Sequence, residues 1–195
     1  MEKIYLDDQI FYIDNFLSDA SFNSFLDMCK EYDNKFEYKE DFFLNRGAFN
    51  MYGLELKESY RLAWEELTFK LEDLCNNDIH SIGKRMSITK FKKYNESDNN
   101  SELSFGRHSD DYGFINESDG VDSNTTAIFL GLNYYINDSY DGGEVCYPNK
   151  NIRMKPKQNS LLCHPGSEEY EHEVTQIFND DKYTVPCFAI NNKLF

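Results

Sequence analysis

The chain has 195 residues, which suits one domain with a sizeable hydrophobic core. Hydrophobic residues make up 40% and aromatic residues 16% of the composition, which excludes an intrinsically disordered chain despite a mean hydropathy of -0.69. The formal net charge of -15 repels phosphate backbones, so we expect no nucleic-acid partner.

The N-terminal part is predicted to contain a short strand over residues 10–14, followed by a helix. Ser18 suits the N-cap of this helix, because its hydroxyl can accept a hydrogen bond from a free backbone N–H of the first turn. Apolar side chains then follow at helical spacing. They are Phe22, Phe25, Leu26 and Cys29.

A second helix is expected over residues 58–75, and the two asparagines at 76–77 would end it. Its apolar side chains recur every three or four residues, which is the period of one helix face. They are Leu62, Trp64, Leu67, Leu71 and Leu74. We therefore expect residues 1–84 to form a helical support layer.

After about residue 84, short β-like segments alternate with turn signals. The expected strands cover residues 86–94, 105–110, 125–136, 144–147, 160–164, 172–177 and 182–190. Many short strands at this spacing are typical of an all-β barrel or a jelly roll of two facing sheets. The sequence thus predicts one domain, residues 1–195, that is mainly β with N-terminal helices, with residues 85–195 as the jelly-roll core.

Two polar segments, residues 95–104 and 111–124, flank the expected strand at 105–110. Both are expected to be loops. They are either tolerated surface insertions or a lid that covers a substrate.

One residue separates His108 from Asp110 on an expected strand, so their side chains project from the same face. An imidazole and a carboxylate so placed can bind one cation. A histidine from a neighbouring strand would complete a two-histidine, one-carboxylate facial triad, which leaves coordination positions open and is typical of non-haem Fe(II) oxygenases. A surface His and Asp in a loop would give the same pattern, so the other residues of the sequence have to distinguish a metal site from such a loop.

The remaining histidines are His80, His164 and His172. His80 lies in a turn at a helix exit and is expected to be structural. His172 opens a β-like segment, and Lys182 follows ten residues later on the next one, so a hairpin would bring the two together. His164 is followed by a Pro-Gly turn and lacks such a cationic partner. We therefore prefer His172 as the second histidine ligand, with His164 as the alternative.

These features together resemble the 2-oxoglutarate- and Fe(II)-dependent oxygenase superfamily, in its prolyl 4-hydroxylase branch. The segment Phe-Gly-Arg-His-Ser-Asp at residues 105–110 matches its aromatic-x-x-His-x-Asp motif. Tyr-Tyr-Ile-Asn at 134–137 and Gly-Gly-Glu-Val at 142–145 look like its Tyr-Leu-Asn and Gly-Gly-Glu-Leu run. The strand-to-helix entry at 12–18 and the segment at 170–174 around the distal histidine also agree. The resemblance implies a double-stranded β-helix, the cupin-like jelly roll.

The resemblance also implies residue roles. His108, Asp110 and His172 would bind iron, and Lys182 would pair with the C5 carboxylate of 2-oxoglutarate. Tyr135 would donate a hydrogen bond to that carboxylate, and Thr184 would assist it. Tyr94 would line the pocket near the metal.

A member of this superfamily would use Fe(II), 2-oxoglutarate and O2, with ascorbate as a further expected cofactor, and would release succinate and CO2. The branch favours hydroxylation of a proline in a peptide or protein substrate. The alternatives are hydroxylation of a small molecule or free amino acid, and a jelly-roll module that binds without catalysis. A cupin-type isomerase or hydrolase would not need Lys182.

The chain departs from the branch at several positions. Phe105 stands where tyrosine is common, residues 95–104 lengthen a usually short link, and His164 occupies a position that is usually apolar. The arginine-rich C-terminal motif of the nucleic-acid demethylases is missing.

The sequence shows no clear targeting signal. No apolar run approaches the ~20 residues that span a bilayer, and the first residues do not resemble a secretory signal, so we expect a cytoplasmic protein without membrane contact. The 5 cysteines are scattered, which argues against a disulfide framework or a zinc ribbon and favours buried thiols.

Overall fold

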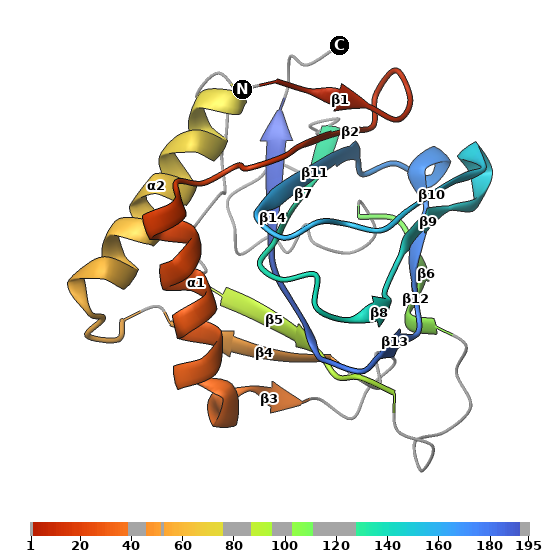
Figure 1. Ribbon diagram of the computed structural model, residues 1–195. Helices are drawn as coiled ribbons and strands as arrows, with labels where there is room; N and C mark the ends of the chain where they lie inside the picture. Colours follow the sequence, from red (N-terminus) through yellow and green to blue (C-terminus); the bar gives the residue numbers. More distant parts are fainter. Residues whose placement is uncertain are drawn as a thin grey trace.

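In the part of the chain that it describes, a computed structural model shows two helices, two larger β-sheets and a two-stranded ribbon (Figure 1). It describes residues 2–38, 46–51, 53–75, 87–94, 103–110 and 128–191. The predicted boundary near residue 84, His80, residues 111–124 and most of the segment 95–104 lie outside these ranges. The division into a support layer and a core therefore stays a prediction.

Two helices were expected, and both form. Helix α1 spans Asp19–Glu31, and helix α2 spans Glu58–Leu74. Ser18 caps α1 as predicted: its side chain accepts a hydrogen bond from the backbone N–H of Ser21 at 3.4 Å. Short 3-10 turns occur at Asp33–Lys35 (η1), Pro148–Lys150 (η3) and Glu168–Tyr170 (η4).

The larger sheet has eight antiparallel strands in the order β1-β2-β11-β7-β14-β5-β4-β3. Its central strands come from the C-terminal half and its edges from the N-terminal half. In sheet order they are β1 (Ile4–Tyr5), β2 (Phe11–Ile13), β11 (Ser160–Pro165), β7 (Ile128–Tyr135), β14 (Lys182–Asn191), β5 (Ser87–Phe91), β4 (Arg46–Asn50) and β3 (Glu37–Tyr38).

The smaller sheet has four strands in the order β10-β9-β12-β6. They are β10 (Ile152–Met154), β9 (Val145–Tyr147), β12 (His172–Thr175) and β6 (Leu103–His108). β8 (Asp141–Gly142) and β13 (Ile177–Phe178) pair antiparallel in a separate two-stranded ribbon.

Helices α1 and α2 cover one face of the larger sheet, on the side away from the smaller sheet (Figure 1). Successive strand residues point to opposite faces, so only alternate residues meet the helices. On β7, Leu132 and Tyr134 pack in one core with Phe25 of α1 and Trp64 of α2. This core is the main hydrophobic interior of the molecule.

The other face of the larger sheet packs against the smaller sheet. Tyr135 of β7 and Leu162 of β11 share a second core with Val145 and Tyr147 of β9. The intervening residues of the central strands therefore point into the space between the two sheets. This is the interior of a β-sandwich.

Several details differ from the predictions. Leu62 was expected on the buried face of α2, but it is 49% exposed, and Tyr60 and Ala63 are buried instead. Leu103 and Ser104 belong to β6 and not to a loop. The sequence did not predict β3 and β4, whose residues lack a clear period-two pattern.

The predicted hairpin between His172 and Lys182 is wrong. His172 begins β12 in the smaller sheet, whereas Lys182 begins β14 in the larger one. Strand β13 and the turn after it carry the chain across between the sheets. His164 lies inside β11, which runs through Pro165, and not beside a turn.

No helix among the described ranges is both long and apolar enough to cross a membrane. The cytoplasmic location stays a prediction.

Candidate metal centre

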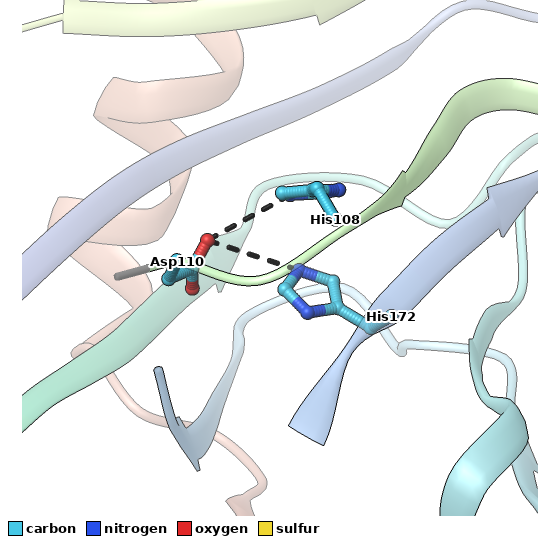
Figure 2. A group of neighbouring side chains, drawn as sticks. All are labelled: His108, Asp110 and His172. Carbon is cyan, nitrogen blue, oxygen red and sulfur yellow. Dashed lines mark ion pairs between the residues drawn. The ribbon is translucent and has the colours of Figure 1, made fainter. Parts of the chain in front are cut away.

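Two neighbouring strands of the smaller sheet bring His108 and His172 together. β6 and β12 pair antiparallel, with His108 directly opposite His172, and the ring centroids are 4.3 Å apart. Asp110 follows two residues after His108, just beyond the end of β6. Figure 2 shows the two imidazoles and the carboxylate pointing toward one another.

The three side chains are close enough to share one ion. Oδ1 of Asp110 lies 3.7 Å from Nε2 of His108 and 4.0 Å from Nε2 of His172 (Figure 2). One ligand atom from each residue lies within 4.8 Å of the other two. The two histidines are therefore near enough to share one cation with Asp110.

Backbone carbonyls orient both imidazoles. Nδ1 of His108 lies 2.8 Å from the carbonyl oxygen of Gly106, and Nδ1 of His172 lies 3.2 Å from that of Tyr170. A carbonyl oxygen only accepts, so we assign the ring proton to Nδ1 in each case. The lone pair on Nε2 is then left facing Asp110. This is the usual arrangement of metal-binding histidines, in which the second ring nitrogen is held by an outer partner.

Burial keeps these imidazoles neutral. It lowers the pKa of His172 to about 3, with a smaller contribution from the nearby His164, and it also lowers the pKa of His108. A neutral imidazole binds a metal without first losing a proton. Side-chain exposure is 24% for His108 but only 6% for His172 and Asp110, so His108 marks the side nearest solvent.

His164 lies at the same carboxylate. It points from the inner face of β11, is fully buried, and places its Nε2 3.6 Å from Oδ2 of Asp110. Its ring centroid is 4.5 Å from that of His172. From the sequence, His172 and His164 are alternatives for the second histidine ligand, yet the structure brings both to Asp110. Burial lowers the pKa of His164 to about 4.

A glycine on the neighbouring strand makes room for this contact. A Cβ atom built on Gly131 of β7 would lie 2.2 Å from Oδ2 of Asp110 and 2.5 Å from Nε2 of His164. Both distances are far below van der Waals contact. Any other residue at this position would therefore push apart the carboxylate and the imidazole.

Lys182 begins β14 and points into the interior between the sheets, with an exposed fraction of only 1%. Nζ donates to the carbonyl oxygen of Gly143 at 2.8 Å. No carboxylate pairs with it among the described ranges of the chain. Burial, with a smaller contribution from Lys155, lowers the pKa of Lys182 to about 7. A buried ammonium with two unused donors is suited to an anionic ligand.

Aromatic rings surround this ammonium. Nζ of Lys182 lies 5.1 Å from the ring centroid of Tyr135, 5.6 Å from that of Tyr140 and 5.8 Å from that of Phe91. Burial raises the pKa of Tyr135 well above 10, so its hydroxyl stays protonated and can donate. Thr184, also buried, sits opposite Tyr135 in the β14–β7 register.

Tyr94 lies at a different place from the other predicted site residues. Its backbone N–H donates to the carbonyl oxygen of Ile177 at 2.7 Å, and its ring is 6.0 Å from that of Phe178, a partly exposed residue of β13. A role for Tyr94 near the metal stays a prediction.

Two buried tyrosine hydroxyls near the site were not predicted from the sequence. Those of Tyr140 and Tyr147 have no hydrogen-bond partner in the described part of the chain. The ring of Tyr147 lies 5.6 Å from His172 and 5.4 Å from His164, and Tyr140 packs beside Lys182. Tyr140 adjoins the Gly-Gly motif, which is the one sequence signal that pointed toward it.

The chain matches no known family model, and no curated protein matches it in sequence. Solved structures, by contrast, match over nearly the whole chain. A viral collagen prolyl hydroxylase from Paramecium bursaria Chlorella virus-1, in a complex with 2-oxoglutarate, has a TM-score of 0.64 at 14% identity, covering 95% of this chain and 97% of its own.

Two further structures agree. A prolyl hydroxylase from Trichoplax adhaerens, in complex with a peptide fragment of the hypoxia inducible factor oxygen degradation domain, has a TM-score of 0.64 at 18% identity, covering 95% of this chain and 84% of its own. A prolyl 4-hydroxylase from Pseudomonas putida has a TM-score of 0.63 at 12% identity, with coverages of 95% and 93%.

The chain has the prolyl 4-hydroxylase fold. The predicted jelly roll with N-terminal helices is thereby confirmed, as is the resemblance at the level of fold. At these identities the likeness shows the fold alone.

Proposed function

We propose that this protein is an Fe(II)- and 2-oxoglutarate-dependent dioxygenase that hydroxylates a C–H bond. The observation that carries the proposal is the pairing of two features inside one sandwich. A His-Asp-His set offers one carboxylate and two Nε2 lone pairs. The ammonium of the fully buried Lys182 has N–H donors beyond the one that the carbonyl oxygen of Gly143 accepts.

The donor set fits iron. Two imidazoles and one carboxylate from His108, Asp110 and His172 leave coordination positions open, which Fe(II) oxygenases require. A closed structural zinc site would use four protein ligands, commonly with cysteine, and no cysteine belongs to this group of candidate ligands in the described ranges. When bound, the iron would supply redox chemistry with dioxygen that no side chain can supply.

The interior around Lys182 fits a dicarboxylate. Lys182 and Tyr135 would bind the C5 carboxylate, with Thr184 beside them, because each can donate to an anion without leaving the buried interior. The unpartnered hydroxyl of Tyr140 next to Lys182 would gain an acceptor. Holding the far end in this way would orient 2-oxoglutarate toward the triad.

2-Oxoglutarate, O2 and a substrate C–H bond would give succinate, CO2 and the hydroxylated substrate. We infer a proline in a flexible peptide or protein segment as the substrate, because the matched structures are prolyl hydroxylases and one of them holds a peptide. The net charge of -15 disfavours nucleic acid. An effect of ascorbate stays a prediction.

Anaerobic titration tests the proposed cofactors. The protein with Fe(II) and 2-oxoglutarate should develop a weak visible charge-transfer band, which Fe(II) alone should not give. Absence of the band, together with no succinate release with any peptide, would favour a binding module instead.

A mass screen tests the substrate. Proline-containing peptides incubated with the protein, Fe(II), 2-oxoglutarate and air should gain about 16 Da, the mass of one oxygen atom, if the C–H bond is hydroxylated. Matched peptides with alanine in place of proline should not gain it. A gain in the alanine peptides as well would overturn proline specificity and leave the dioxygenase activity standing.

A further inference from the structure

Tyr147 of β9 carries a fully buried hydroxyl to which neither the triad nor Lys182 gives a role. The side chain has an exposed fraction of 0%, and the hydroxyl has no hydrogen-bond partner among the described residues. A buried hydroxyl without a partner destabilises a fold, whereas a phenylalanine would fill the same space without that cost. The hydroxyl therefore indicates a ligand that completes its hydrogen bonding.

The strand register places Tyr147 in one row with two candidate metal ligands. His108 lies opposite His172 in the β6–β12 pair. Cys146 lies opposite Glu173 in the β9–β12 pair, so Tyr147 follows as the neighbour of His172 on the same face of the sheet. The ring centroids of Tyr147 and His172 are 5.6 Å apart. Tyr147 thus stands directly beside the triad.

The side chain of Tyr147 also reaches from the smaller sheet toward the larger one. It packs in the second core with Tyr135, which lies beside Lys182. Burial raises the pKa of Tyr147 well above 10, and Tyr135 and the charge of Asp110 add to this rise. The hydroxyl therefore keeps its proton and interacts electrostatically with groups at both ends of the proposed co-substrate site.

The part of the chain that the structure describes offers no acceptor to this hydroxyl. The ring of His164 lies 5.4 Å from that of Tyr147, yet its Nε2 is also without a hydrogen-bond partner in that part. The other buried hydroxyl of this kind, that of Tyr140, lies beside Lys182, where the C5 carboxylate of 2-oxoglutarate would accept from it. Tyr147 borders the histidines instead, so its hydroxyl would meet the opposite end of the same molecule.

We propose that Tyr147 binds the metal-chelating end of 2-oxoglutarate, with its hydroxyl donating to the 1-carboxylate. A carboxylate that binds a metal through one oxygen keeps the other oxygen as an acceptor. Tyr147 would orient this end, while Lys182 and Tyr135 hold the C5 carboxylate at the far end. This inference rests on the proposed dioxygenase function.

Titrations with two ligands that share only the metal-chelating end test this assignment. The probes are 2-oxoglutarate and 2-oxopentanoate, which has a methyl group in place of the C5 carboxylate. Each is titrated anaerobically into the Fe(II)-loaded full chain, and the visible charge-transfer band gives the Kd without turnover. Tyr147→Phe should raise the Kd of both probes by about tenfold or more, the loss expected for one charge-assisted hydrogen bond. Lys182→Met should raise the Kd of 2-oxoglutarate only.

Tyr134→Phe is the matched control, because it removes a buried hydroxyl from the outer core, where that hydroxyl donates to Oδ1 of Asn159 at 3.1 Å. It should lower the melting temperature and leave both Kd values unchanged. Tyr147→Phe should do the reverse. It removes a hydroxyl without a partner, so the ligand-free variant should melt at the wild-type temperature or above it.

Equal Kd values for wild type and Tyr147→Phe would overturn the inference and leave the proposed function standing. A loss confined to 2-oxoglutarate would overturn the assignment to the metal-chelating end. A lower melting temperature of ligand-free Tyr147→Phe would mean that the hydroxyl already has a partner, which also contradicts the inference. If wild type develops no band with 2-oxoglutarate, the proposed function fails, and this inference fails with it.

Discussion

The central strands β7, β11 and β14 present two contrasting faces, although each face is made of alternate residues of the same three strands. The outer face carries Leu132, Leu161 and Val185 and packs against the helices. The inner face carries His164 and Lys182, both buried with at most 1% exposure. Burying polar groups destabilises a fold, whereas burying apolar groups stabilises it. The contrast therefore separates the face that packs against the helices from the face that carries the residues of the proposed ligand site.

The largest effect is expected at the carboxylate shared by the histidines. Asp110→Ala should abolish turnover and weaken metal binding by at least about 100-fold, because it removes both the negative ligand and the group that the three imidazoles face. Metal titration and succinate release measure this. Asp27→Ala, at an exposed residue of α1, should change neither. An Asp110→Ala protein that still binds iron tightly would contradict the assigned metal centre.

Truncation on the outer face should affect stability instead. Leu132→Ala creates a cavity in the fully buried core beneath the helices, so the free energy of unfolding should fall by about 2–5 kcal/mol. Denaturant unfolding measures it, and metal affinity of the folded protein should stay near wild type. Leu54→Ala, at an exposed leucine, should cost under about 0.5 kcal/mol. Equal losses in both variants would contradict the assigned outer core.

Lys182→Met tests the anion site on the inner face. It keeps the buried volume but loses the ammonium, so the KM for 2-oxoglutarate should rise roughly 10- to 100-fold, as expected for one lost charge-assisted hydrogen bond. Lys157→Met, at an exposed lysine paired with Asp14, is the matched control and should leave KM unchanged. An isomerase or hydrolase would keep its activity in Lys182→Met.

The Gly131→Ala variant tests whether the close approach of Asp110 to His164 is important for metal binding. The added Cβ would displace Asp110 and His164, so metal affinity should fall by roughly tenfold or more. Gly106→Ala is a matched control in β6 beside His108, where a Cβ meets nothing within 4 Å. If both variants bind iron as wild type does, the geometry around Oδ2 of Asp110 is not important for binding.

The pH dependence of stability should show the smallest effect. The pKa of Lys182 is lowered from 10.5 to about 7 on folding, so between these values the unfolded chain binds more protons. The ligand-free protein should therefore gain stability as pH rises from about 7 toward 9, with a contribution on the order of 1 kcal/mol per pH unit. The difference in melting temperature between wild type and Lys182→Met should narrow over this range. A constant difference would mean that Lys182 keeps its proton in the folded protein over this range, so that folding does not lower its pKa.

Local patterns were sufficient for much of the fold and part of the site. Helices α1 and α2, the cap at Ser18 and most central strands follow from side-chain periodicity, which depends on near neighbours in the chain. The pairing of His108 with Asp110 on one face needed only the period of a strand. Strands β3 and β4 were missed because pairing with a neighbouring strand, and not a pattern of their own, keeps them extended: β4 pairs with β5, and β3 pairs with β4.

The sequence by itself determined the residue types at the site and their order: a His-x-Asp pair, a later histidine and a lysine ten residues beyond it. Only the tertiary structure decided that His164 and His172 both face Asp110, because one comes from each sheet and no spacing along the chain relates them. The same holds for Lys182 with Tyr135 and Tyr140, which meet through the packing of β14, β7 and the Gly-Gly turn. Contacts between distant segments depend on how the two sheets pack, and that packing is a property of the whole chain.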